Sequence, residues 1–349
     1  MVKLEETAKK LIKTLKETDF QILNEYNVVL LPDFFIDHFI KLKNFENSYE
    51  KIKIIHEQGG GNYPESSQYI TQGGNSANTA LALSTLGVKP HLICKTSRFG
   101  LYLLEFFLGK EGVDLSCVKT NGKLAITTAL EFEDNNSNVM IGELGSVSNF
   151  SYELLDDHDK KIISNSNMVC VTTWNLNKHG STLAENIFKL AKKHGIKTYF
   201  DTGDPSPKKH EIRNLTEKIL PDKNLEIVGL NENELKYYSN SETNTNEEII
   251  DTAKKLKEKI HARVDVHTAD FACSIKDKPV VVPSFKKTNI RRTTGAGDAW
   301  NAGNIFGELL NFDDDERLLF ANSVAFCYIT NPDPVHPTIQ DIINLLGNI

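Results

Sequence analysis

The residues best suited to chemistry lie at 292–300, which read RTTGAGDAW and open an apolar helix expected to run to about Leu310. Glycines let the backbone turn tightly, and the start of a helix carries partial positive charge. The segment therefore predicts an anion hole formed by Gly295, Ala296 and Gly297. A carboxylate inside such a hole, here Asp298, suits a base that accepts the proton of an attacking hydroxyl. The structural alternative is that Asp298 only favours the first turn of the helix.

A second segment, QGGNSANTA at residues 72–80, also leads into an apolar helix. Its glycines permit close approach of a ligand. Amide side chains both donate and accept hydrogen bonds, so they suit a polyhydroxylated substrate. The spacing predicts a substrate pocket lined by Gly74, Asn75 and Asn78. Helix capping is the alternative, and it explains Asn75 better than Asn78.

These two segments, in this order and about 220 residues apart, resemble the ribokinase-like (PfkB) carbohydrate kinase family. The likeness extends from about residue 28 to the end of the chain. It implies an α/β fold with a doubly wound, mainly parallel sheet flanked by helices, and a small β lid. It also implies ATP-dependent transfer of the γ-phosphoryl group to a hydroxyl of a sugar, sugar derivative or nucleoside. ATP and Mg²⁺ are the expected cofactors, and Asp298 is the expected base.

The segment NENE at residues 231–234 follows the apolar stretch LEIVGL and matches a third element of the family. In that resemblance Asn231 contributes to cofactor binding and Glu234 acts on Mg²⁺ through water. A carboxylate suits this place because Mg²⁺ keeps several waters. Capping of a helix by the same Asn and Glu is the alternative.

The resemblance assigns the remaining site residues. Asp37 is placed at the end of the first strand, where the family binds substrate hydroxyls, and Asp33 is its nearby competitor. Thr268 falls in the nucleotide loop, and Asn322 resembles a position close to the adenine. Asp201 and Asp204 also follow a strand, but a turn cap explains them and they are left out of the catalytic set.

Three segments depart from the family pattern. Arg292 stands where the family usually has an Asp that belongs to a loop holding a monovalent cation such as K⁺. A guanidinium offers donors and no acceptor, so Arg292 is expected to replace the ion; the alternative is that it points to solvent, paired with a surface carboxylate. The nucleotide loop at residues 267–270 lacks its usual glycine, and residues 95–100 lack the usual Gly and Asp.

The elements that must position these residues alternate between apolar strands and amphipathic helices, which is typical of a parallel sheet. Strands are expected in YNVVLL, HLICK, NMVCVTT, IKTYFD, LEIVGL and ARVDVHT. Helices are expected near residues 3–17, 76–86, 100–111, 180–194, 247–260 and 314–328. We expect an N-terminal helical extension over residues 1–26 and one kinase domain over residues 27–349.

Two segments interrupt the alternation, at about residues 37–72 and 124–143. The second reads as a hairpin, TTALEF and NVMIG, joined by turn-forming residues at 133–137. Together the segments predict a small sheet over the end of the main domain, which is either a lid over a binding cleft or an edge insertion. A homodimer formed through this lid is one further expectation.

Composition limits the partners. The 349 residues carry a formal charge of -7, so no cationic excess favours nucleic acid or an anionic membrane. The first residues lack the apolar core of an export signal, and charged residues and a proline interrupt the longest apolar stretch. A cytoplasmic protein with reduced, mostly buried cysteines is expected.

Other classes of function are less compatible with the motifs. There is no G-x-x-x-x-G-K-[ST] phosphate loop, and no G-x-G-x-x-G opens a helix after the first strand. The alternative to a kinase is a non-catalytic sensor that keeps the fold to bind a sugar or nucleoside. A base such as Asp298 has no use in a sensor, so the kinase is favoured, with a small-molecule hydroxyl as its acceptor.

Overall fold

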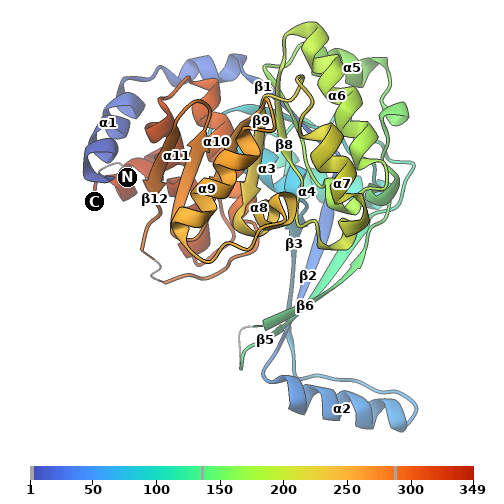
Figure 1. The fold of residues 1–349 in the computed structure, drawn as a ribbon. Helices are drawn as coiled ribbons and strands as arrows, with labels where there is room; N and C mark the ends of the chain where they lie inside the picture. The colour runs from blue at the N-terminus through green and yellow to red at the C-terminus, as the bar shows by residue number, and fades with distance from the viewer. Residues whose placement is uncertain (1–3, 135–136, 287–288) are drawn as a thin grey trace.

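The computed structural model describes residues 4–134, 137–286 and 289–349, and it places an eight-stranded sheet at the centre of the molecule (Figure 1). The strand order is β12-β11-β10-β9-β8-β7-β1-β4. The strands are β1 (Asn27–Leu31), β4 (Lys89–Leu92), β7 (Met168–Val171), β8 (Lys197–Asp201), β9 (Ile227–Asn231), β10 (Arg263–His267), β11 (Phe271–Ile275) and β12 (Pro279–Pro283). The six strands from β10 to β4 pair in parallel, and β11 and β12 extend the sheet antiparallel.

Burial on both faces explains why the central strands are continuous apolar runs. All four residues of β7 are buried, as are four of the five in β1. Successive side chains of a strand point to opposite faces. Val28 and Leu30 accordingly join one hydrophobic cluster, and Val29 and Leu31 join the other.

Helices cover both faces of this sheet. They are α1 (Leu4–Glu17), α3 (Asn75–Thr85), α4 (Arg98–Phe107), α5 (Asp157–Ser164), α6 (Gly180–His194), α7 (Ile212–Asn214), α8 (Glu232–Ser239), α9 (Asn246–Lys257), α10 (Ala296–Leu309), α11 (Asp314–Thr330) and α12 (Ile339–Leu346). Residues of α1, α3, α10, α11 and α12 form the first cluster, and residues of α5, α6, α8 and α9 form the second. The expected doubly wound α/β architecture is confirmed.

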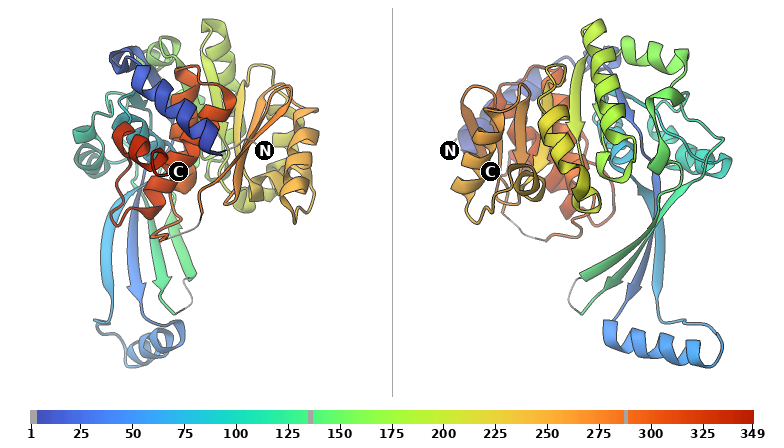
Figure 2. Two further views of the ribbon diagram at one scale, coloured as in Figure 1. Left: turned by 90° about the vertical axis from the view of Figure 1, so that its left-hand side faces the viewer. Right: turned by 45° about the vertical axis from the view of Figure 1, so that its right-hand side comes forward.

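A second, four-stranded sheet projects from the main domain (Figures 1 and 2). Its order is β3-β2-β5-β6, and its strands are β2 (Phe35–Leu42), β3 (Ser67–Gly73), β5 (Ala125–Phe132) and β6 (Ser137–Glu143). The helix α2 (Phe45–Glu57) lies at its far end. We call residues 35–73 and 125–143 the lid; the predicted small sheet and its hairpin are confirmed.

The structure also corrects several details. The strand expected at residues 91–95 lies at Lys89–Leu92, and the helix expected to reach residue 260 ends at Lys257. Ser137 begins β6 instead of lying in the turn, while residues 135–136 of that turn fall outside the described residues. Neither α2 nor the β11–β12 edge was expected.

The N-terminal helix packs into the main domain. Leu11 and Leu15 of α1 are fully buried in the same cluster as α11 and α12. Its amphipathic pattern, with apolar residues three and four apart, explains this packing. No helix in the described residues is long and apolar enough to span a membrane. Four of the five cysteines are buried free thiols, and Cys327 is partly exposed.

Candidate active site

Asp298 lies in the first turn of α10 and is buried. Asn78 of α3 donates from Nδ2 to Asp298 Oδ2 at 2.9 Å, so the two predicted motifs meet although about 220 residues separate them. Burial raises the pKa of the Asp298 carboxyl well above its usual value, and the charges of Asp201, Asp33 and Asp37 raise it further. A carboxylate with a raised pKa is a stronger base than an exposed one.

The three residues predicted for the anion hole, Gly295, Ala296 and Gly297, lie at the N-terminus of α10. Gly295 is the N-cap, with a φ of 81° that favours glycine, and a Cβ there would lie 2.9 Å from Tyr328 Oη. The N–H of Ala296 donates to the Thr293 carbonyl at 3.2 Å. Of the three predicted donors, Ala296 therefore already has a partner, whereas Gly295 and Gly297 keep N–H groups at the positive end of a fourteen-residue helix.

The first strand of the sheet ends where the stretch YNVVLL predicted, six residues before Asp37. β1 ends at Leu31, so Asp33 follows that strand directly, and Asp37 is the third residue of β2 in the lid. Asp33 is fully buried, and its Oδ1 accepts from Ser76 Oγ at 2.6 Å and Thr172 Oγ1 at 2.8 Å. The placement of Asp37 at the end of the first strand is therefore wrong, because the chain enters the lid after residue 34.

Both carboxyls nevertheless border one cavity of about 280 Å³ between the main sheet and the lid. Gly74, Asn75, Asn78 and Asp298 also line this cavity. Gly74 has a φ of 98°, and a Cβ there would lie 2.8 Å from Asp33 Oδ2, so both conformation and space require glycine. We call this space the acceptor cavity. It brings together every residue predicted for the substrate and the base.

A larger groove of about 800 Å³ continues from the acceptor cavity between the lid and the 290–295 loop. Asp37, Asn78 and Gly295 border both spaces. The lid contributes Lys41, Glu131 and Glu133 to the groove, and the loop contributes Arg291 and Arg292. The lid therefore forms one wall of both spaces, which favours its interpretation as a lid over a cleft.

Arg292 is bound to backbone carbonyls. Its Nη1 donates to the carbonyls of Tyr328 at 2.8 Å and Asn331 at 2.7 Å, and its Nη2 donates to that of Pro332 at 2.8 Å. Its guanidinium carbon lies 5.5 Å from the centre of the Tyr328 ring. The expected alternative, a solvent-facing Arg292 paired with a surface carboxylate, is wrong, because three carbonyls at and just after the end of α11 accept its hydrogen bonds.

Asn231 and Glu234 cap α8 reciprocally. Asn231 Oδ1 accepts from the Glu234 N–H at 2.9 Å, while the Asn231 N–H and Nδ2 donate to the Glu234 carboxylate at 3.0 and 2.8 Å. Glu234 is buried, and burial raises its pKa well above the usual value, with the charges of Asp201 and Asp204 adding to the shift. Capping is thus present, but it leaves an excess of negative charge that a divalent cation would neutralise.

The two other predicted nucleotide-binding residues are engaged within the protein. Thr268 Oγ1 donates to the Phe271 carbonyl at 3.0 Å and accepts from the Phe271 N–H, closing the turn between β10 and β11. Asn322 Oδ1 accepts from Trp300 Nε1 at 2.9 Å, and its Nδ2 lies 3.3 Å from the Pro283 carbonyl. Neither residue borders the acceptor cavity or the groove.

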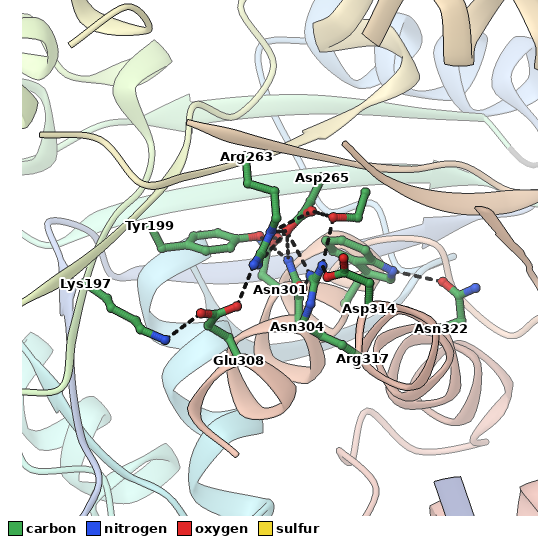
Figure 3. A network of polar contacts seen from close by, with 12 residues as sticks. Lys197, Tyr199, Arg263, Asp265, Asn301, Asn304, Glu308, Asp314, Arg317 and Asn322 are labelled. Carbon is green, nitrogen blue, oxygen red and sulfur yellow. Dashed lines mark hydrogen bonds and ion pairs between the residues drawn. The ribbon is translucent and has the colours of Figure 1, made fainter. Parts of the chain in front are cut away.

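A buried polar network fixes α10 against the sheet (Figure 3). Asn301, Asn304 and Glu308 lie on one face of α10 and contact residues of two strands, β8 and β10. Asn301 donates to Asp201 Oδ2, and Asn304 Nδ2 donates to Asp265 Oδ2 at 3.0 Å. Glu308 pairs with Arg263 at 2.6 Å and with Lys197 at 2.6 Å. The same helix carries Asp298, so the network holds the predicted base in place.

Sequence reasoning missed the electrostatic role of Asp201 and the burial of Arg317. Asp201 does cap a turn as expected, since its Oδ1 accepts from the Gly203 N–H at 2.8 Å, but its charge also raises the pKa of Asp298 and Glu234. Arg317 is fully buried and pairs with Asp265 at 3.0 Å. A charged residue inside the apolar helix RLLFANSVAF was the signal that could have revealed Arg317.

Comparison with known proteins shows the family of the chain. The family model described as pfkB family carbohydrate kinase matches residues 45–341. The 5-dehydro-2-deoxygluconokinases of two Clostridium botulinum strains are 25% identical over 295 residues, which cover 77% of this chain and 82% of the relative.

Solved structures share the fold. The ribokinase of Arabidopsis thaliana, complexed with ribose and ATP, has a TM-score of 0.75 at 18% identity and covers 93% of this chain and 99% of its own. The 2-dehydro-3-deoxygluconokinase of Thermotoga maritima has a TM-score of 0.73 at 16% identity, covering 92% and 98%. The adenosine kinase of Sinorhizobium meliloti has a TM-score of 0.71 at 17% identity, covering 93% and 99%. The expected ribokinase-like fold is confirmed.

Proposed function

Because the chain belongs to the pfkB family of carbohydrate kinases, we propose that it transfers the γ-phosphoryl group of ATP to a hydroxyl of a sugar, sugar derivative or nucleoside. The family makes it a phosphotransferase with an alcohol group as acceptor. One observation carries the finer proposal. The carboxyl of Asp298 borders the acceptor cavity and lies in the first turn of α10, beside the N–H groups of its anion hole.

Asp298 is the proposed base. Among the described residues its side chain has one hydrogen-bond partner, Asn78, which donates to Oδ2. Oδ1 is thereby left to accept the proton of the acceptor hydroxyl as that hydroxyl attacks phosphorus. The N–H groups of Gly295 and Gly297 face the negative charge that develops on the transferred group. Asn78 positions the carboxylate because it links α3 to α10.

Mg²⁺ is the proposed metal, and Glu234 is proposed to act on it through water. Burial raises the pKa of both Asp201 and Glu234, and the charge of Asp201 adds to the shift of Glu234, so these two carboxyls lie close together. When bound with ATP, Mg²⁺ neutralises phosphate charge. Asn231 keeps its role as the cap of α8 and orients the Glu234 carboxylate. We propose that Thr268 and Asn322 lie near the nucleotide, where they order the β10–β11 turn and Trp300.

The experiment is an ADP-release assay with ATP, Mg²⁺ and a panel of sugars and nucleosides. On the acceptor that supports turnover, Asp298→Asn is expected to lower kcat by about 10²- to 10⁴-fold, because the amide keeps the turn but cannot act as the base. Asp251→Asn on the outer face of α9 is the matched control and keeps wild-type kcat. Retention of most kcat by Asp298→Asn would remove it as base.

The same assay separates the kinase from a sensor of the same fold. A sensor binds sugar or nucleoside and releases no ADP, whereas the proposed kinase releases ADP in proportion to phosphorylated acceptor. Absence of ADP release with every acceptor that binds would favour the sensor.

A further inference from the structure

The charges that border the acceptor cavity indicate which kind of acceptor it takes. Four carboxyl groups line the cavity, those of Asp33, Asp37, Asp204 and Asp298. No lysine, arginine or histidine borders it among the described residues. Resting on the proposed function, we infer that the acceptor is an uncharged polyol, a sugar or nucleoside that carries neither a carboxylate nor a phosphate.

Three of the four carboxyl groups, those of Asp33, Asp37 and Asp298, lie close enough to interact electrostatically. Burial raises the pKa of Asp37 to about 6, and the charge of Asp33 contributes to that shift. The pKa of Asp298 is raised by burial and then by the charges of Asp201, Asp33 and Asp37. An anionic acceptor would bring a further negative charge into a cavity whose described lining holds no lysine, arginine or histidine. Like charges brought close together lower the affinity for such a ligand strongly.

Two buried oxygen atoms at the cavity lack hydrogen-bond donors among the described residues. Asp33 Oδ2 is buried and has no hydrogen-bond partner among the described residues, while its Oδ1 is held by Ser76 and Thr172. Asn175 also borders the cavity; its Nδ2 donates to the Asp204 carbonyl at 2.8 Å, and its Oδ1 is buried without a partner in the described chain. A hydroxyl donates to such oxygens, whereas a carboxylate or phosphate anion can only accept.

In the part of the chain that the structure describes, the cations that border the larger groove are Lys41, Arg291 and Arg292. Lys41 Nζ lies 4.0 Å from Glu131 Oε2 and 5.4 Å from the centre of the Tyr69 ring. The Arg292 guanidinium donates to three backbone carbonyls. Arg291 is exposed and borders the groove without bordering the acceptor cavity. The carboxylate or phosphate of an anionic acceptor could therefore pair with Arg291 only if it lay in the groove, outside the acceptor cavity.

The test compares acceptors in pairs that differ by one anionic group: an aldose and its aldonate, a sugar and its phosphate, and a nucleoside and its 5′-monophosphate. With ATP and Mg²⁺, the neutral member is expected to have a kcat/KM at least about tenfold higher. A preference for the anionic member in the pair turned over best would overturn the inference. Loss of that preference in Arg291→Gln would then locate the acid group in the groove.

Asp204→Asn tests the origin of the discrimination. Asp204 borders the cavity and is exposed, and its replacement removes one negative charge while keeping the shape of the side chain. We expect the ratio of kcat/KM between neutral and anionic acceptor to fall about threefold or more. Asp251→Asn, which changes the same charge on α9, leaves the ratio unchanged. An equal change in both variants would overturn the proposed role of the cavity charges.

Equilibrium binding keeps this inference separate from the proposed function. Calorimetric titration of the same pairs without ATP measures charge preference even if no phosphate is transferred. Tighter binding of the neutral members with no ADP release would support the inference and overturn the proposed phosphoryl transfer. Turnover restricted to anionic members would overturn the inference and keep the kinase. Failure of every neutral member to bind would overturn the inference.

Discussion

Replacement of Arg292 by Ala tests whether its guanidinium serves as a built-in cation beside the anion hole. The guanidinium ties the loop before Gly295 to three carbonyls at the end of α11. A hydrogen bond contributes about 0.5–1.5 kcal/mol net, so three bonds at this half-buried site are worth about 2 kcal/mol. If the anion hole loses this support in the transition state, kcat falls by up to about 30-fold.

The expected response to K⁺ follows from the same carbonyls. Wild-type protein already has a cation among them, so its rate in K⁺ and in tetramethylammonium at equal ionic strength should be the same. In Arg292→Ala the carbonyls of Tyr328, Asn331 and Pro332 lose their donor, and carbonyl oxygens are good ligands for K⁺. Partial recovery of kcat by K⁺ is therefore expected in the variant alone.

Arg291→Ala is the matched control for this experiment. Arg291 and Arg292 both donate their backbone N–H to the Ile329 carbonyl, at 2.8 and 3.3 Å, so either variant removes one charge and keeps that bond. We expect Arg291→Ala to retain wild-type kcat on an uncharged acceptor. A tenfold stimulation of the wild type by K⁺, equivalent to about 1.4 kcal/mol of barrier, would refute the reasoning.

Three further variants test groups around the site. Glu234→Gln keeps one of the two acceptors that Glu234 offers to Asn231, and it should raise the Mg²⁺ concentration for half-maximal rate while leaving acceptor KM nearly unchanged; the reverse pattern would contradict its role. The pKa of Asp37 is raised to about 6 by burial, so this carboxyl destabilises the fold increasingly as the pH rises from its ordinary pKa to about 6, and by a constant amount above that. Asp37→Asn should gain about 2 kcal/mol of unfolding free energy at pH 8 and nothing near pH 3.5, as urea denaturation at both pH values would show. Asp265→Asn removes the buried carboxylate partner of Arg317 and leaves it only the half-exposed Asp314, so it should cost about 3 kcal/mol in the same assay, whereas a cost below about 1 kcal/mol would contradict the network.

The sequence alone was sufficient to predict the two helix starts that carry the candidate site residues. The glycines before Asp298 and those before Asn75 predicted two helix starts, and both helices begin there. Short-range spacing could not show that Asn78 donates to Asp298, because that bond joins helices distant in the chain. The hydrogen-bond partners of Arg292 could not be predicted for the same reason, because they lie 36 to 40 residues further along the chain.

The errors have physical causes too. The apolar run from Val28 to Ile40 hides the change of sheet after Leu31, so Asp37 was placed on the wrong strand. The helix α2 was missed although Phe45, Tyr49 and Ile52 recur at helical spacing; these side chains are exposed and only Ser48 of the helix is buried, so the helix is not part of the alternation that builds the main domain. The edge strands β11 and β12 escaped because Pro279 and Pro283 bound the second of them, and proline at the end of a strand resembles a loop signal.

The parallel pairing of β2 with β5 has a consequence for the order of folding. The lid is formed from two stretches of chain separated by β4, α3 and α4, and Phe35 pairs with Ala125 across that separation. A parallel pair cannot close through a short hairpin, so the β1–β4 part of the main sheet must bring the two stretches together first. Contacts of high sequence separation form slowly. The acceptor cavity, with one wall from each sheet, is therefore completed late, and nascent chains gain their binding site only after the central core is formed.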